Sequence, residues 1–321
     1  MQHPKTKLMG NKTMSDLSSG IEYSEHYTDI GDWQPGDLDY FTIDQNWSGY
    51  TPENHEMWQH LYKRQMEVLP GRAIDMYMDS LSTLGITQER IPKVEEINEI
   101  LMKRTGWEVV CVPGLIPYEP FFELLANRKF PAGQFIRKPE EMDYIQEPDI
   151  FHDVFGHVPI LADPTFADYV EAFGRGGMKA TKLDAIMEIF RVYWFTVEFG
   201  LIKEKDGLKI YGAGILSSPT ESKFCLESDS PHHIHFDVKR IMRTHNNIDD
   251  FQENYFVIDD FQELFDKTAE PDFTPYYEEI KKLPTIMPGE IVDGDVVLQK
   301  GTMEHQKIAD EKRKSKKVFE R

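Results

Sequence analysis

The sequence predicts a single, mainly α-helical domain with small β elements, and three observations support this fold class. Apolar residues recur at helical spacing over most of the chain, runs that resemble strands are few and short, and no Gly-Ser linker or internal repeat divides the sequence. We expect residues 1–20 to be disordered, residues 21–300 to form the catalytic domain, and residues 301–321 to form a basic helix or tail.

The N-terminal half is expected to be helical around one short strand. Segment 53–69, for example, has apolar residues at helical spacing and ends at Pro70-Gly71, which stops a helix. The expected elements are an irregular arm over 21–53 whose aromatic residues pack on the body, helices over 53–69, 72–84, 91–105 and 117–128, a strand over 107–112, and an extended segment over 130–137.

The C-terminal half is expected to alternate helices with short strands. Pro219 after two serines marks one helix start. Because Pro231 and acidic residues flank the three histidines at 232, 233 and 235, that stretch is expected to be a solvated loop. The other expected elements are helices at about 164–174, 181–201, 236–244 and 260–268, strands at 208–216 and 256–258, and turns with one strand after 283.

Composition and charge exclude several classes of function. The 321 residues carry a formal net charge of −20, which disfavours binding to nucleic acid or to anionic membranes. The two cysteines, Cys111 and Cys225, are far apart and form no CxxC motif, so neither a disulfide framework nor a cysteine zinc site is expected. The polar N-terminus lacks the apolar segment of a secretory signal, and no run is long enough for a membrane span. We therefore expect a cytoplasmic protein.

Two histidines, His152 and His157, lie in the stretch EPDIFHDVFGHVP. Residues five apart on a regular α-helix are rotated by ~500°, so these two side chains would diverge by ~140°. A helix end or a π-bulge near Gly156 would aim them at one point. The spacing therefore predicts that the helix holding His152 ends or distorts before His157, if both bind one metal ion.

A carboxylate completes a possible metal site. Glu198 lies among apolar residues in YWFTVEFGL, where a charged group needs a cation or hydrogen bonds. Two histidines and one carboxylate match the facial triad of non-haem iron(II) oxygenases, although zinc with the same ligands remains chemically possible. Arg137, fifteen residues before His152, could grip a substrate carboxylate, or could equally be a surface arginine.

Three motifs occur together and in order: EPDIFHDVFGHVPILAD, YWFTVEFGL and YGAGILSS. Over about residues 106–265 the chain resembles the pterin-dependent aromatic amino acid hydroxylases. The resemblance implies a catalytic domain of that family, with Fe(II) held by His152, His157 and Glu198. L-phenylalanine, O₂ and a tetrahydropterin are the implied small-molecule partners.

The resemblance also implies roles for residues around the metal. Arg137 would pair with the substrate carboxylate, and Phe121 would be the platform on which the pterin stacks. The implied substrate-side residues are Arg137, Pro148, Trp194, Thr196, Ser217 and Tyr144, and the implied pterin-side residues are Phe121, Gly114, Ile116 and Asp153.

Substrate choice is inferred from the same resemblance. Trp194 argues against an indole substrate, and Val257 stands roughly where tyrosine-specific members have an acid, so we expect phenylalanine to be converted to tyrosine. Ile145 and Tyr118 depart from the family pattern beside the substrate and the pterin. The chain resembles single-domain bacterial members and is expected to be a monomer, with a dimer possible. The alternatives are tyrosine or tryptophan hydroxylation, a zinc hydrolase using Asp153 as an acid, and a catalytically silent amino-acid-binding protein.

Overall fold

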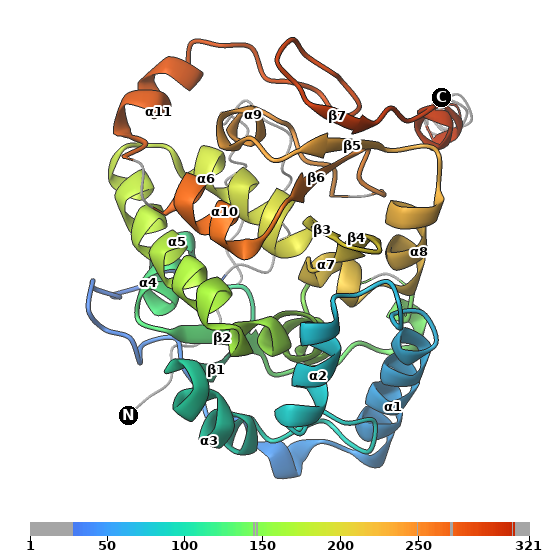
Figure 1. Ribbon diagram of the computed structural model, residues 1–321. Coiled ribbons are helices and arrows are strands. Elements are labelled where there is room, and N and C mark those ends of the chain that lie inside the picture. Colours follow the sequence, from blue (N-terminus) through green and yellow to red (C-terminus); the bar gives the residue numbers. More distant parts are fainter. Residues whose placement is uncertain are drawn as a thin grey trace, which may run out of the picture.

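Helices dominate the computed structural model of the chain, so the expected mainly α fold with small β elements is confirmed (Figure 1). The expected disorder of residues 1–20 and most of the basic C-terminal segment lie outside the described residues, although residues 304–309 are helical. The structure describes residues 28–309 and 311, apart from Tyr144, Gln146, Asp249, Glu270 and Pro271.

Three helices form one end of the molecule, namely α1 (Pro52–Met66), α2 (Asp75–Thr83) and α3 (Val94–Thr105) (Figure 1). Thr51 caps α1 by accepting a hydrogen bond from the Asn54 backbone, and the Asn54 side chain accepts one from the Thr51 backbone in return. Gly106 ends α3 at a φ of 74°, which glycine adopts without strain. These helices lie where the apolar spacing places them.

A parallel pair of strands, β1 (Glu108–Val112) and β2 (Lys129–Gly133), lies beside these helices and is connected by α4 (Tyr118–Ala126). The preceding arm packs on this unit: the Ile43 backbone donates to the Cys111 carbonyl at 2.8 Å, and Phe41 is buried against Val112 and Ile116. From residue 28 onward, the expected aromatic arm is therefore confirmed. It closes the side of the molecule that carries α4.

The expected helices at 164–174 and 181–201 had the wrong bounds. One helix, α5 (Pro164–Lys182), runs through three glycines, and α6 (Ile186–Tyr193) follows a break at Asp184. Glycine here permits close packing, because a Cβ at Gly174 would lie 2.3 Å from the Ala126 backbone nitrogen of α4. Close contact between α4 and α5 explains these glycines. The apolar spacing of the sequence gives no sign of that contact.

A five-stranded sheet forms the other end of the molecule, in the order β4-β3-β6-β5-β7 (Figure 1). The pairs β3–β6 and β5–β6 are parallel, whereas β3–β4 and β5–β7 are antiparallel. The strands are β3 (Leu201–Glu204), β4 (Gly207–Ile210), β5 (His232–His235), β6 (Asn254–Ile258) and β7 (Val297–Gln299). The helices around them are α7 (Ala213–Leu216), α8 (Pro219–Glu227), α9 (Val238–Met242), α10 (Phe261–Thr268) and α11 (Thr274–Ile280).

Two expectations for this half were wrong. The strand expected over 208–216 ends at Ile210, and residues 213–216 turn into α7. The histidine-rich stretch expected as a solvated loop is β5, paired on both sides by β6 and β7. His233 is buried there and its Nε2 contacts the Cys225 carbonyl at 2.8 Å. Backbone pairing and hydrogen bonds to the rings offset the cost of burying these polar side chains.

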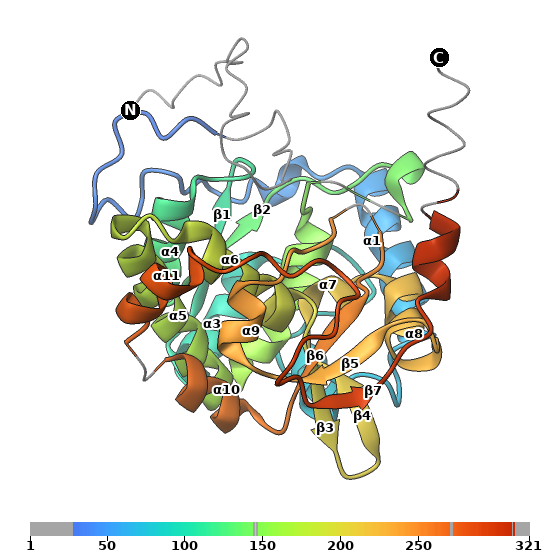
Figure 2. The same cartoon turned by 90° about the horizontal axis from the view of Figure 1, so that it is seen from above.

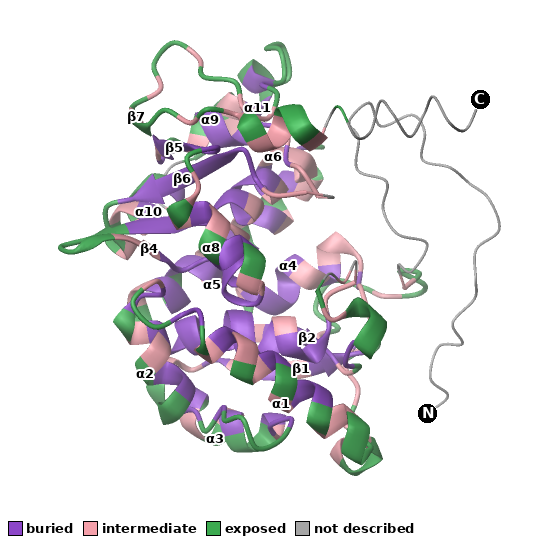
Figure 3. Cartoon of the chain, turned by 90° about the vertical axis from the view of Figure 1, so that its right-hand side faces the viewer, coloured by how far each residue is buried: buried purple, intermediate pink, exposed green. Residues whose placement is uncertain are grey.

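One continuous cluster of buried apolar side chains joins the two ends of the molecule. It includes Leu61 of α1, Phe155 between the ends, and Ile258 of β6. Seen from above, α7 lies in the interior among the helices, whereas the β3–β4 hairpin projects at the edge of the molecule (Figure 2). In the side view the buried residues lie on the inward faces (Figure 3). No helix in the described part of the chain is long and apolar enough to cross a bilayer.

Candidate metal centre and adjoining cavity

The backbone between the two histidines is a π-helix, Phe151–His157, which leads directly into a 3₁₀ turn over Val158–Ala162. In a π-helix each N–H bonds five residues back, so residues five apart come onto the same side. The expected distortion before His157 is thereby confirmed. The spacing of five, which would separate the two side chains on an α-helix, directs His152 and His157 to the same side of the π-helix.

Glu198 is presented by a second π-helical segment, Trp194–Glu198, which continues α6. The chain then turns at Gly200 and returns at Gly212, where the Gly212 nitrogen donates to the Gly200 carbonyl at 3.1 Å. Both segments that carry the three side chains are thus irregular helices. Such π-bulges are frequent at functional sites.

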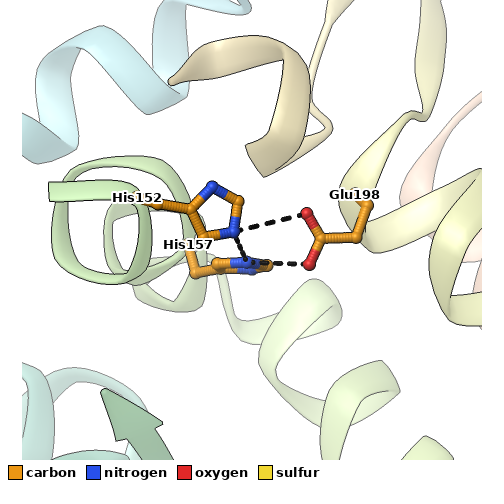
Figure 4. A group of neighbouring side chains, drawn as sticks. All are labelled: His152, His157 and Glu198. Atoms are coloured by element: carbon orange, nitrogen blue, oxygen red, sulfur yellow. Dashed lines mark hydrogen bonds and ion pairs between the residues drawn. The ribbon is translucent and has the colours of Figure 1, made fainter. Parts of the chain in front are cut away.

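The three side chains converge on one point, as Figure 4 shows. The two histidine Nε2 atoms are 3.2 Å apart, and the Glu198 oxygens lie 3.0 Å from His157 Nε2 and 3.5 Å from His152 Nε2. Ligand atoms at about 2.1 Å from one ion and at right angles to each other lie about 3 Å apart. The donor set therefore fits one divalent metal bound on a single face, with the remaining positions open to the cavity.

Electrostatics keep the carboxylate in its ligand form. Burial opposes ionisation of Glu198, but the neighbouring His157 and His152 hold its pKa well below the usual range. Burial also opposes charge on His152, yet Glu198 raises the pKa of that imidazole. A metal ion would take the place of the proton, since it needs an ionised carboxylate and neutral imidazoles.

Ser217, at the end of α7, orients one of the histidines. Its Oγ lies 2.9 Å from His152 Nδ1 and also donates to the Ala213 carbonyl at 2.9 Å. Fixing Nδ1 leaves Nε2 directed at the metal position. Ser217 thus contacts a proposed ligand, in addition to lining the cavity where the resemblance places it.

Replacing Gly212 with alanine is expected to disturb the metal site. A Cβ there would lie 2.4 Å from the Glu198 carbonyl oxygen and 2.5 Å from the Gly200 nitrogen, and backbone atoms cannot move aside cheaply. We expect Gly212→Ala to lower both the melting temperature and the metal content. Gly176→Ala is the control, since nothing lies within 4 Å of its Cβ position. A Gly212→Ala protein with unchanged metal content would contradict this account.

A cavity of about 650 Å³ opens above the three side chains. Of the residues implied by the family resemblance, Tyr144 lies outside the described residues and Thr196 lies away from the cavity. The structure brings the others together around it: Arg137, Pro148, Trp194, Ser217, Phe121, Gly114, Ile116, Asp153, His152, His157 and Glu198.

Arg137 is buried and held by a carboxylate that the sequence reasoning did not single out. Its Nε and Nη2 donate to the two Asp149 oxygens at 2.9 and 2.8 Å, and the Arg137 backbone nitrogen donates to the same group at 2.9 Å. The His152 nitrogen also donates to Asp149 at 3.0 Å. Asp149 therefore fixes the arginine beside the metal position. Its place inside EPDIFHD was the available signal.

Aromatic rings also line the cavity. Phe121 packs edge-on against Tyr193 with ring centroids 5.7 Å apart, and the loop with Gly114 and Ile116 lies alongside. Asp153 accepts a hydrogen bond from the Gly133 nitrogen at 2.7 Å. Burial raises the pKa of Asp153 to about 6, although His152 and His157 oppose the change. The cavity lining here thus combines apolar side chains with one buried acid.

Two residues named from the resemblance do not face the cavity. Thr196 is fully buried, and its hydroxyl donates to the Val192 carbonyl at 2.6 Å and lies 3.0 Å from the Tyr169 hydroxyl. The structure thus gives Thr196 a place in the core beside the π-helical segment. Val257 is buried in β6 and pairs with Leu201 and His235, so it does not line the cavity.

A second group of metal-binding side chains lies at the edge of the sheet. His235 Nε2 is 3.5 Å from Asp259 and 3.7 Å from Glu263. Asp259 is exposed, and Lys267 already pairs with Glu263. This group lies outside the residues that line the cavity.

Comparison with known proteins identifies the family. Residues 45–286 match the model of the biopterin-dependent aromatic amino acid hydroxylases. The chain belongs to this family. It is 56% identical over 264 residues to a phenylalanine-4-hydroxylase of Ralstonia nicotianae, covering 82% of this chain and 84% of that one. A second phenylalanine-4-hydroxylase, from Caulobacter vibrioides, is 54% identical and covers 84% and 91% of the two chains.

A solved structure agrees with this membership of the hydroxylase family. The iron- and phenylalanine-bound phenylalanine hydroxylase of Chromobacterium violaceum superposes with a TM-score of 0.77 at 50% identity. The match covers 80% of this chain and 94% of that one. The expected single catalytic domain of this family is therefore confirmed as the fold.

Proposed function

We propose that the protein hydroxylates L-phenylalanine to L-tyrosine, with O₂ and a tetrahydropterin as cosubstrates and Fe(II) held by His152, His157 and Glu198. The observation that carries this proposal is the convergence of these three ligand atoms at one end of the cavity that also holds Arg137 and Phe121. Membership of the biopterin-dependent family and relatives named phenylalanine-4-hydroxylase support the choice of reaction.

Bound Fe(II), with the reduced pterin, would supply the redox chemistry that activates O₂. The chain's own residues hold the reactants within reach of one another and keep bulk water out. His152, His157 and Glu198 would hold the ion from one side, since all three line the cavity. The overall reaction places one oxygen atom on the phenyl ring and the other on the pterin, which leaves as the 4a-hydroxypterin.

The substrate side is set by one charged and two apolar contacts. We assign the substrate carboxylate to Arg137, whose orientation Asp149 fixes. Pro148 and Trp194 would wall the aromatic ring, and Trp194 is itself held by a hydrogen bond from its Nε1 to Gln252 at 3.0 Å. A rigid indole wall favours a phenyl ring over a larger indole. Tyr144 remains a proposed contact from the same segment.

Replacing Phe121 with alanine is expected to weaken use of the pterin more than use of phenylalanine. The Phe121 ring would stack on the pterin, and aromatic pairs contribute about 0.5–1.5 kcal/mol beyond their buried area. We expect the KM for tetrahydropterin to rise several-fold with little change in the KM for phenylalanine. Equal increases in both would show that Phe121 serves the core instead of the cofactor platform.

The deciding test of the proposed function is one competition assay. Iron-loaded protein is given L-phenylalanine, L-tyrosine and L-tryptophan together with tetrahydropterin and O₂, and products are separated by chromatography. Tyrosine formed from phenylalanine as the preferred product supports the proposal. Preference for another amino acid would make tyrosine or tryptophan hydroxylation the function, and pterin-independent hydrolysis with zinc would reject the oxygenase assignment.

We further propose that the enzyme is a cytoplasmic monomer. Cys111 and Cys225 are both buried free thiols, as suits a reducing compartment. Light scattering on the purified protein would measure its mass in solution. A dimeric mass would correct the proposed oligomeric state without affecting the assigned chemistry.

A further inference from the structure

Glu221 is a buried carboxylate of α8 that the reaction outlined above does not use. The residue is 6% exposed and lines the cavity. One of its oxygens, Oε1, accepts hydrogen bonds from the Tyr255 hydroxyl and from the Gln252 nitrogen. Burial raises the pKa of Glu221 to about 7 in spite of these two bonds. A carboxyl group in this setting would gain from a nearby cation.

Of the other four carboxylates that line the cavity, three lie within ion-pair distance of a basic side chain. Asp143 pairs with Arg64 at 2.6 Å, Asp250 pairs with His305 at 2.7 Å, and Glu198 faces the two histidines. Asp153, the fourth, accepts a hydrogen bond from the Gly133 nitrogen at 2.7 Å, and His152 and His157 partly oppose the rise that burial causes in its pKa. Among the described residues, no lysine, arginine or histidine forms an ion pair with Glu221. Its second oxygen, Oε2, therefore lacks a cationic partner within the described part of the chain.

The only lysine or arginine among the described residues that line the cavity is Arg137, which Asp149 holds at two nitrogens. An amino acid entering this cavity brings two charges. Its carboxylate can reach Arg137, but its ammonium group needs an anion, because burying an unpaired charge is costly. The cavity lining holds more carboxylates than lysines or arginines, so it can supply an anion for the ammonium group.

A chain of contacts links Arg137 to Glu221, and both residues line the cavity. Arg137 contacts Asp149, Asp149 accepts from the His152 nitrogen, and His152 Nδ1 lies 2.9 Å from Ser217. Ser218 follows directly and caps α8 by accepting a hydrogen bond from the Glu221 nitrogen at 3.3 Å. Arg137 and Glu221 thus stand at the two ends of one connected path of hydrogen bonds and neighbouring residues.

We propose that Glu221 binds the α-ammonium group of the amino-acid substrate and so selects amino acids over aromatic acids that lack the ammonium group. This inference rests on the proposed function, since it names a recognition contact of the same site. Tyr255 and the Gln252 backbone would position the carboxylate by occupying Oε1, which leaves Oε2 for the ligand.

The test compares two ligands that differ only in the ammonium group. Binding of L-phenylalanine and of 3-phenylpropanoate to the anaerobic iron(II)-loaded protein is measured by calorimetry for wild type and Glu221→Gln. Glutamine keeps the shape and an acceptor oxygen for Tyr255 but lacks the charge. We expect L-phenylalanine to bind at least tenfold more weakly to the variant, while the affinity for 3-phenylpropanoate changes less than twofold.

Asp143→Asn is the matched control, since it neutralises a carboxylate of the same cavity that Arg64 already pairs. It should leave both affinities unchanged. Equal losses for both ligands in Glu221→Gln, or no loss for L-phenylalanine, would overturn the proposal. Should Glu221→Gln fail to fold, Glu221→Asp keeps the charge and shortens its reach, and the same selective loss is required of it.

The same measurements separate this inference from the proposed function. Tyrosine formation by the wild-type protein tests the hydroxylase assignment directly. Selective loss of L-phenylalanine affinity in Glu221→Gln tests the ammonium contact without any turnover. A wild-type protein that makes tyrosine but binds 3-phenylpropanoate as tightly as L-phenylalanine would keep the function and reject the role of Glu221.

Discussion

Glu198→Gln is expected to lose bound iron and hydroxylase activity together. Glutamine keeps the size of the side chain but removes the negative charge that faces His152 and His157 at 3.5 and 3.0 Å. Mutating a residue that only hydrogen-bonds to a metal ligand lowers metal affinity or activity by about 10- to 100-fold. Losing a ligand itself should therefore lower both by more than about 100-fold. His157→Ala should have the same effect. Iron content by mass spectrometry and tyrosine formation by chromatography measure the two losses in one preparation.

Glu263→Gln is the matched control for this prediction. Glu263 belongs to the second group of metal-binding side chains, with His235 and Asp259 at the sheet edge. Its replacement should leave iron content and turnover unchanged. Full turnover by an iron-depleted Glu198→Gln protein would reject the assigned metal centre. Loss of iron in Glu263→Gln alone would move the centre to the sheet edge.

Arg137→Lys is expected to raise the KM for phenylalanine strongly. An ammonium group cannot reproduce the planar fork that Asp149 holds at 2.8 and 2.9 Å, so the substrate carboxylate loses its oriented partner. A hydrogen bond between charged groups contributes about 1.5–3 kcal/mol, which corresponds to about 10- to 150-fold in affinity. Steady-state kinetics with phenylalanine and pterin varied in turn would show whether the increase is confined to phenylalanine.

Arg240→Lys supplies the control for a buried arginine–aspartate pair. Arg240 contacts Asp295 at 2.9 Å and is also buried, but it is not among the residues lining the cavity. Its replacement should lower the melting temperature without raising the KM for phenylalanine. If Arg137→Lys changed stability and left the KM unchanged, Arg137 would be a structural residue only.

Local patterns were sufficient for the elements that depend on neighbours in the chain. The bounds of α1, α3, β1 and α10 follow from apolar spacing, capping residues and Pro or Gly stops, all of which act within a few residues. The patterns failed where contacts between distant segments decide the structure. α5 runs through Gly174 and Gly177 because α4 packs against it, and β5 is buried because two strands pair with it.

In the candidate site, too, some residues could be found from local sequence and others only from contacts between distant segments. The residue pattern pointed to His152, His157 and Glu198, and the resemblance to the family added Arg137 and Phe121. The spacing of five required the distortion that the π-helix Phe151–His157 provides. Asp149 was missed although it lies inside EPDIFHD, because the motif does not show that Arg137 is its partner. Glu221 was missed because its partner Tyr255 lies thirty-four residues away in the sequence. Thr196 was placed on the substrate side because it lies in a shared motif, yet its hydroxyl bonds within the core.

The sequence by itself thus determined the fold class, the family and the ligand types of the metal centre, since these depend on residue identity and short-range order. Only the tertiary structure decided which charges are paired and which face the cavity. Arg137 and Asp149 are twelve positions apart in the sequence, whereas Glu221 and Tyr255 are thirty-four positions apart. Burial then fixes the strength of those contacts, because a charge removed from water must find its partner within the fold.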